Sequence, residues 1–129
     1  MYRRRLLIAA AACAALAPLA HAATVADYTP AAFAAAQKAG RPILVHINAS
    51  WCPTCAVQRP VLAKLEDEAQ YKTLDVFRVD FDSQKAAVRA FGATMQSTLI
   101  AFHGTTETAR SVGETDAGKI AALVKSTLR

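Results

Sequence analysis

The stretch Ile43–Cys55, with the sequence ILVHINASWCPTC, decides more about the fold of this chain than any other. It opens with an apolar run that only His46 interrupts, a pattern typical of a central strand buried on both faces. It closes with Cys52 and Cys55, which two residues separate. The sequence therefore predicts a buried strand, a tight turn and a helix that begins at the cysteine pair.

The spacing of the two cysteines indicates a reversible redox pair. If a helix begins between them, Cys52 lies at its N-terminus, where unpaired backbone N–H groups favour a thiolate. Cys55 then lies one turn further along, below its partner and shielded from solvent. A disulfide across two residues closes a loop too short to restrict the unfolded chain much, so a purely structural role fits poorly. Cys52 is the candidate nucleophile and Cys55 the candidate resolving thiol.

Residues 1–22 have the pattern of a secretory signal peptide. Three arginines, Arg3–Arg5, precede an alanine-rich apolar run, and Ala20–Ala22 offers the small residues that a signal peptidase recognises. We expect cleavage after this triplet, which leaves residues 23–129 as one domain in the periplasm, an oxidising compartment. A membrane anchor is the alternative, but Pro18 interrupts the run, which is short for a full span.

Composition limits the partners of this chain. The formal net charge of +5 includes the three signal arginines, so the remainder carries only +2. No basic stripe is interleaved with aromatic residues, and nucleic-acid binding is therefore not expected. Of the three cysteines, Cys13 lies in the signal run and should leave with it. Acylation of Cys13 is the alternative, although Ala10–Ala12 lacks the leucine of a good lipidation motif.

The rest of the chain alternates between helix and strand signals. The predicted segments, in order, are a helix from Thr29 and Pro30 to Gly40, a strand at 43–47, a helix from Pro53, a strand at 76–81, a helix at 83–91 before Gly92, strands at 98–102 and 108–112, and a helix from about Thr115. This order predicts a small three-layer α/β domain.

Two of the predicted helices have an apolar face. In the helix from Pro53 the expected core residues are Val57, Val61 and Leu65, with Leu62 beside them. Pro60 should kink this helix, because proline removes one backbone hydrogen bond. In the last helix the expected core residues are Ile120, Leu123, Val124 and Leu128.

With these elements placed, the chain resembles the thioredoxin family over essentially all of residues 23–129. The residues that carry the resemblance are Ile43–Val45, Trp51, the two cysteines, Pro60, Asp82, Phe91 and Gly92, Thr98, Phe102 and Gly113. The resemblance implies a thioredoxin-like three-layer sandwich, a central mixed β-sheet flanked by helices. The Pro-Thr pair between the cysteines is similar to that of exported reductants serving cytochrome c maturation.

The resemblance also implies an activity, that of an exported thiol–disulfide oxidoreductase needing no cofactor. Cys52 would attack a substrate disulfide, and Cys55 would then release the reduced substrate from the mixed disulfide. The implied partners are a disulfide-containing protein substrate and a membrane electron donor, and a monomer is expected. The implied substrate-binding residues are Trp51, Pro53, Gln96, Ser97 and Thr98. For Trp51, packing in the core is the alternative.

The chain departs from the family pattern at Ser97, where the family usually has a cis-proline. Because a cis bond before a non-proline residue costs roughly 3–4 kcal/mol, we expect the segment Met95–Ser97 to be trans or strained. The family uses this loop to hold the substrate backbone and to keep the sulfurs from binding metals, and both properties are in question here. The Ser97 hydroxyl is a candidate hydrogen-bond donor to Cys52.

Two further departures concern charge near the sulfurs. His46 replaces the buried acid that many thioredoxins place under the resolving cysteine. A neutral imidazole there is a candidate base for the Cys55 proton, and a core histidine bonded to a backbone carbonyl is the alternative. Arg78 stands where the family has a lysine, and it would lower the thiol pKa values without giving up a proton. A solvated residue at a strand edge is the alternative for Arg78.

Two functions from other classes stay open at this point. A soft-metal site for a copper-type ion would use Cys52, Cys55 and His46, although three ligands are few for a closed site. A folding-assistance module would make the cysteines incidental. A zinc ribbon would need a second CxxC pair, and haem attachment would need histidine rather than Ala56 after the motif.

Overall fold

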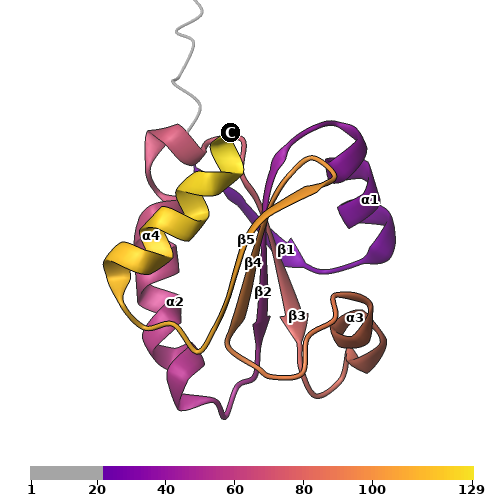
Figure 1. The fold of residues 1–129 in the computed structure, drawn as a ribbon, viewed down its shortest axis with the longest axis vertical. Helices are drawn as coiled ribbons and strands as arrows, with labels where there is room; N and C mark the ends of the chain where they lie inside the picture. The colour runs from indigo at the N-terminus through magenta and orange to yellow at the C-terminus, as the bar shows by residue number, and fades with distance from the viewer. Residues whose placement is uncertain (1–21) are drawn as a thin grey trace, which may run out of the picture.

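The structure is a computed structural model and describes residues 22–129. The expectations for signal cleavage, membrane anchoring and Cys13 concern residues outside this part of the chain. The elements, shown in Figure 1, are β1 (Thr24–Asp27), α1 (Pro30–Lys38), β2 (Pro42–Asn48), α2 (Pro53–Glu66), the 3-10 turn η1 (Ala69–Tyr71), β3 (Asp75–Asp80), α3 (Lys85–Ala90), β4 (Thr98–His103), β5 (Thr106–Val112), α4 (Ala117–Lys125) and the 3-10 turn η2 (Ser126–Leu128). None of the helices within residues 22–129 has the length and apolar character needed to cross a membrane.

One five-stranded mixed sheet organises the domain. The strand order is β1-β3-β2-β4-β5, with β1, β3 and β2 parallel to one another and the β2–β4 and β4–β5 pairs antiparallel. Helices α1 and α3 cover one face of the sheet, and α2 and α4 cover the other (Figure 1). The predicted three-layer α/β architecture with a central mixed sheet is confirmed.

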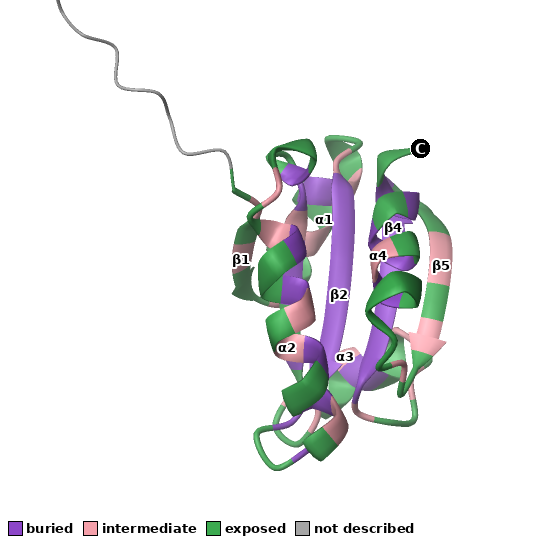
Figure 2. Ribbon diagram, turned by 90° about the vertical axis from the view of Figure 1, so that its left-hand side faces the viewer, coloured by how far each residue is buried: buried purple, intermediate pink, exposed green. Residues whose placement is uncertain are grey.

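Strand β2 lies at the centre of the sheet and is buried along almost its whole length (Figure 2). Its continuous apolar run made it predictable, since both of its faces meet helices. Strand β1 was not predicted. It has only four residues, lies at an edge of the sheet and has no buried side chain, so its sequence shows neither a long apolar run nor a clear alternation.

Helix α1 begins and ends as the sequence predicts. The Thr29 hydroxyl accepts a hydrogen bond from the Ala32 N–H at 3.2 Å, and Pro30 is the first helical residue. Gly40 follows the helix at φ +69°, a conformation that glycine adopts without a steric penalty. The Arg41 N–H then bonds the Ala36 carbonyl and closes the turn into β2.

The buried face of α2 differs from the predicted one. Val57 is 49% exposed, so its assignment to the core is wrong, while Val61 only borders the core. The buried residues are Cys55, Gln58, Leu62 and Leu65. Cys55 packs beneath Cys52 and sets the rotation of the helix, which turns every third or fourth residue after it toward the sheet. Pro60 lies inside α2 as predicted, and the kink stays a prediction.

Helix α4 confirms three of its four predicted core residues, Ile120, Leu123 and Val124. Leu128 is 37% exposed, so its assignment to the core is wrong. The chain tightens into η2 at Ser126, and the 3-10 geometry rotates Leu128 off the apolar stripe of α4.

Two apolar clusters fill the space on either side of the sheet. Leucines dominate the α2/α4 side, including Leu44 from β2 and Leu99 from β4. Aromatic residues dominate the α1/α3 side, where the rings of five residues meet mostly edge to face at centroid distances of 5.2–6.4 Å. These residues are Tyr28, Phe33, Phe77, Phe91 and Phe102.

Candidate active site

The cysteine motif and the segment around Ser97 meet at one end of the sheet. Ile47, near the end of β2, pairs with Thr98 at the start of antiparallel β4. The loop that leaves β2 toward α2 and the loop that enters β4 therefore lie at the same end, the lower end in Figure 1. Residues far apart in sequence are brought together here by the strand register alone.

Cys52 and Cys55 form a disulfide across the first turn of α2, with 5.2 Å between their Cα atoms. Cys52 is the N-cap residue, and its Sγ accepts a hydrogen bond from the Cys55 backbone N–H at 3.1 Å. Cys52 is 2% exposed and Cys55 is fully buried. After reduction the same N–H and the helix N-terminus would favour a thiolate on Cys52. Cys55 is shielded as predicted, and Cys52 is almost as buried in this disulfide form.

Trp51 forms the surface beside the disulfide. Its side chain is 57% exposed, so the alternative of core packing is wrong. The indole Nε1–H donates to Asp82 Oδ2 at 2.7 Å, which fixes the ring across the turn after β3. Asp80 supports this turn by accepting the backbone N–H groups of Asp82 and Ser83 at 2.9 Å each. The hydrogen bond from the Ser83 N–H lowers the pKa of the Asp80 carboxyl group. Pro53, two residues after Trp51, is also exposed.

The loop before β4 is trans and strained, as predicted. No peptide bond in residues 22–129 is cis, and Ser97 has φ +59°, in the left-handed region that costs a non-glycine residue roughly 1–2 kcal/mol. The Ser97 hydroxyl donates to the Gln96 carbonyl at 2.5 Å, and its only proton is therefore not available to Cys52. The proposed Ser97–Cys52 bond is accordingly wrong. Thr98 is buried, and its Oγ1–H donates to the Met95 carbonyl at 2.7 Å.

Behind the disulfide lies a buried polar network that begins at His46. The His46 side chain is 2% exposed, and its Nε2 lies 3.1 Å from Gln58 Oε1 on α2. Gln58 is fully buried and donates through Nε2 to the carbonyls of Ser97 at 3.1 Å and Glu114 at 2.9 Å. His46 was alternatively expected to bond a backbone carbonyl, but its partner is the Gln58 side chain.

Burial keeps the His46 imidazole neutral. Desolvation lowers the pKa of His46 to about 4, the Gln58 hydrogen bond opposes this shift, and the charges of Arg78 and Arg59 add to it. The hydrogen bond found for this ring goes to Gln58 rather than to a sulfur, so the role of base for Cys55 stays a prediction.

Arg78 is exposed on β3, which lies between β1 and β2, so it is not at a sheet edge.

Gln58 is the site residue that sequence reasoning missed. It lies three residues after Cys55, and a helix that buries Cys55 also buries this position. The signal was therefore present as a polar residue in line with Leu62 and Leu65. It was overlooked because the neighbouring Val57 is more apolar, so the predicted buried face of the helix included Val57 instead of Gln58.

The structure does not bring together the ligands of the soft-metal alternative. No group of three histidine, cysteine, aspartate or glutamate side chains within the described part of the chain is placed to hold a metal ion. Cys52 and Cys55 bond each other, and His46 bonds Gln58.

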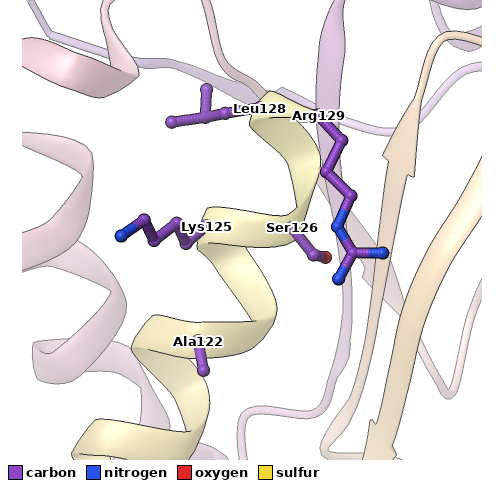
Figure 3. Close-up of a pocket in the computed structure, with 5 residues that line it drawn as sticks. All are labelled: Ala122, Lys125, Ser126, Leu128 and Arg129. Carbon is purple, nitrogen blue, oxygen red and sulfur yellow. The ribbon is translucent and has the colours of Figure 1, made fainter.

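A hollow of about 400 Å³ lies far from the cysteines, at the C-terminal end of α4 (Figure 3). Its lining residues are Ala122, Lys125, Ser126, Leu128 and Arg129. His103 donates through Nδ1 to the Thr127 carbonyl at 2.8 Å, and it pairs with Pro42 at the start of β2. The chain end therefore packs at the opposite end of the sheet from the disulfide, and the hollow is not part of the redox site.

Comparison with known proteins gives one consistent result. A family model described as Thioredoxin matches residues 24–126. Thioredoxin from Chlamydia muridarum is 34% identical over 82 residues, which cover 64% of this chain and 78% of that protein. The crystal structure of Trxlp from Edwardsiella tarda is 40% identical with a TM-score of 0.76, over 78% of this chain and 98% of that one. Thioredoxin from Malassezia sympodialis shares the fold at 21% identity, with a TM-score of 0.70 over 82% of this chain and 93% of that one.

Proposed function

The chain belongs to the thioredoxin family and is a thiol–disulfide oxidoreductase with Cys52 and Cys55 as its redox pair, and we propose that it reduces the disulfides of other proteins after export to the periplasm. The observation that carries the proposed reaction is the hydrogen bond from the Cys55 N–H to Cys52 Sγ at the start of α2. After reduction this bond would stabilise negative charge on Cys52 Sγ, while Cys55 is fully buried.

The proposed reaction needs no cofactor, because the two cysteines supply both electrons. The Cys52 thiolate attacks one sulfur of the substrate disulfide, forms a mixed disulfide and releases the other substrate sulfur as a thiolate. The Cys55 thiol then loses its proton and attacks Cys52 Sγ, which releases the second substrate sulfur. The substrate gains two electrons and two protons, and the protein is left with its Cys52–Cys55 disulfide. A dithiol donor in the membrane would return the pair to its reduced form.

The surface around the sulfurs suits an extended disulfide-containing segment. Trp51 and Met95 are 57% and 49% exposed, and they come from the two loops that meet at this end of the sheet. Pro53, near Trp51 in the sequence, is also exposed, and Gln96, next to Met95, is half-buried. We assign substrate contact to Trp51 and Pro53 and to the loop ending at Thr98.

The sequence before the domain supports export. Its arginines, apolar run and Ala20–Ala22 triplet precede residue 24, where the match to the thioredoxin family begins. Expression of the full chain in a bacterium with a periplasm should give a periplasmic protein whose intact mass corresponds to an N-terminus at Ala23. An unprocessed protein in the cytoplasm would contradict the proposed export and leave the redox chemistry in place.

The redox reaction is tested by trapping. The Cys55→Ser variant should accumulate a mixed disulfide between Cys52 and a protein substrate, because the resolving thiol is missing. The Cys52→Ser variant should form no such adduct, and it should lose reduction of a test substrate such as insulin by about a thousandfold or more. Equal insulin reduction by Cys52→Ser and the unaltered protein would overturn the proposal.

A further inference from the structure

Gln58 is a fully buried polar side chain whose hydrogen bonds all leave its own helix. It joins α2 to three other segments: His46 in β2, Ser97 before β4, and Glu114 after β5. These partners are 12, 39 and 56 residues away in sequence. A buried amide in an apolar helix face is costly unless it is fully bonded, and here both ends of the amide are used.

The partners fix the orientation of the Gln58 amide and the tautomer of His46. Backbone carbonyls only accept hydrogen bonds, so the Ser97 and Glu114 carbonyls must face the amide nitrogen. The amide oxygen therefore faces His46, and the imidazole must donate to it through Nε2–H. The neutral tautomer of His46 with its proton on Nε2 therefore fixes the Gln58 amide with its oxygen toward the imidazole.

This amide also ties the strained loop to the rest of the protein. The bonds from the Ser97 and Thr98 hydroxyls stay within the segment Met95–Thr98. The Ser97 carbonyl, in contrast, accepts from the Gly113 N–H at 3.0 Å and from Gln58 Nε2 at 3.1 Å. Of these two, only Gln58 belongs to the helix that carries the cysteines. It thus connects the position of Ser97 to the position of the disulfide.

We propose that Gln58 is a positioning residue that holds Ser97 in its left-handed conformation within the trans loop Met95–Ser97, so that this loop can bind the backbone of the substrate. This role rests on the proposed function. His46 supports this role by orienting the amide. The pair supplies a restraint that Ser97, which lacks the ring that fixes φ in proline, does not supply by itself.

This role predicts a loss of substrate binding with little loss of sulfur chemistry. Gln58→Met keeps the length of the side chain and removes all three hydrogen bonds. We expect its KM for a protein disulfide to rise about tenfold, the size of one lost buried hydrogen bond, with kcat changed by less than about threefold. The rate at which iodoacetamide alkylates reduced Cys52 should not change, because the Cys55 N–H still faces this sulfur.

Leu62→Ala is the matched control. Leu62 is buried on the same face of α2, one turn after Gln58, and packs in the leucine cluster. This variant weakens the helix packing without touching the network and should leave KM unchanged. An unchanged KM in folded Gln58→Met, or an equal rise in Leu62→Ala, would overturn the proposal.

A measurement on the unaltered protein covers the case in which Gln58→Met does not fold. In nitrogen-15 NMR spectra the two Gln58 side-chain amide protons should exchange slowly, and His46 should carry its proton on Nε2. Fast exchange of these protons, or a proton on His46 Nδ1, would contradict the proposal. If the unaltered protein reduced no protein disulfide, the proposed function would fail, and these spectra would still decide whether the hydrogen bonds of Gln58 to His46 and the Ser97 loop form.

Discussion

The two faces of the central sheet are built from different chemistry. On the α1/α3 face the buried cluster is apolar, and four other aromatic rings pack around Phe33. The α2/α4 face is filled by leucines, but its end near the cysteines contains the bonded pair His46 and Gln58. A buried polar pair contributes less to stability than apolar packing of the same volume. The comparison indicates that the α1/α3 face mainly stabilises the domain. The α2/α4 face has polar side chains in place of apolar packing near the cysteines, and these side chains organise the site.

The largest stability effect should come from the aromatic face. Phe33→Ala removes a ring that lies 5.2–5.8 Å from four other rings. We expect the free energy of unfolding to fall by about 3 kcal/mol, as measured by urea denaturation. Insulin reduction per folded molecule should stay the same.

Val57→Ala on the exposed surface of α2 serves as its control and should change the stability by less than about 0.5 kcal/mol. If folded Phe33→Ala lost activity tenfold, the separation between the two faces would not hold.

An effect of similar size should be a pH dependence that comes from His46 on the polar face. His46 has a pKa of about 4 in the fold, where desolvation by burial disfavours its charged form, against 6.5 for an ordinary histidine. Between these values the unfolded chain binds a proton that the folded protein does not. The neutral imidazole therefore contributes to stability fully above about pH 6.5, and this contribution is lost as the pH falls toward 4.

The expected loss between pH 7 and pH 4 is about 3 kcal/mol, because one pKa unit corresponds to about 1.4 kcal/mol. Urea denaturation of the unaltered protein and of His46→Leu at both pH values isolates it, since the remaining groups titrate in both proteins. The variant should be less stable at pH 7 but lose less stability on acidification. Equal losses in the two proteins would show that His46 is not held neutral by the fold.

The smallest effect concerns the strained loop. Ser97→Gly and Ser97→Ala both remove the bond to the Gln96 carbonyl, but only glycine adopts φ +59° without a steric penalty. We expect the glycine variant to be more stable than the alanine variant by about 1 kcal/mol in thermal or urea unfolding. A more stable alanine variant would mean that Ser97 does not hold the left-handed conformation in solution.

What could be predicted from the sequence follows from the range of the interactions involved. The run before the cysteines is buried on both faces, so β2 and the redox pair were clear from a short window. The trans loop at Ser97 was also predictable, because serine stands where the thioredoxin family has a cis-proline. The rotation of α2 was misjudged, although the predicted burial of Cys55 implied it. Val57 and Gln58 are neighbours, and burial of Cys55 turns Gln58 rather than Val57 toward the sheet.

The polar network was beyond a local pattern for a related reason. Each hydrogen bond of Gln58 reaches a different segment, and the strand register that brings them together exists only in the folded sheet. The edge strand β1 was missed because its four residues bury too little to show a period.

The reduction potential of the Cys52–Cys55 pair tests the central claim most directly. Residues 23–129 would be equilibrated against glutathione mixtures with metals chelated, and the fraction of disulfide measured by alkylation and mass. A reductant should give a reversible equilibrium near −270 mV, toward the reducing end of a range that extends to about −120 mV in related folds. A value near −120 mV would make the protein an oxidant, and failure to reach a reversible equilibrium would contradict the redox account itself.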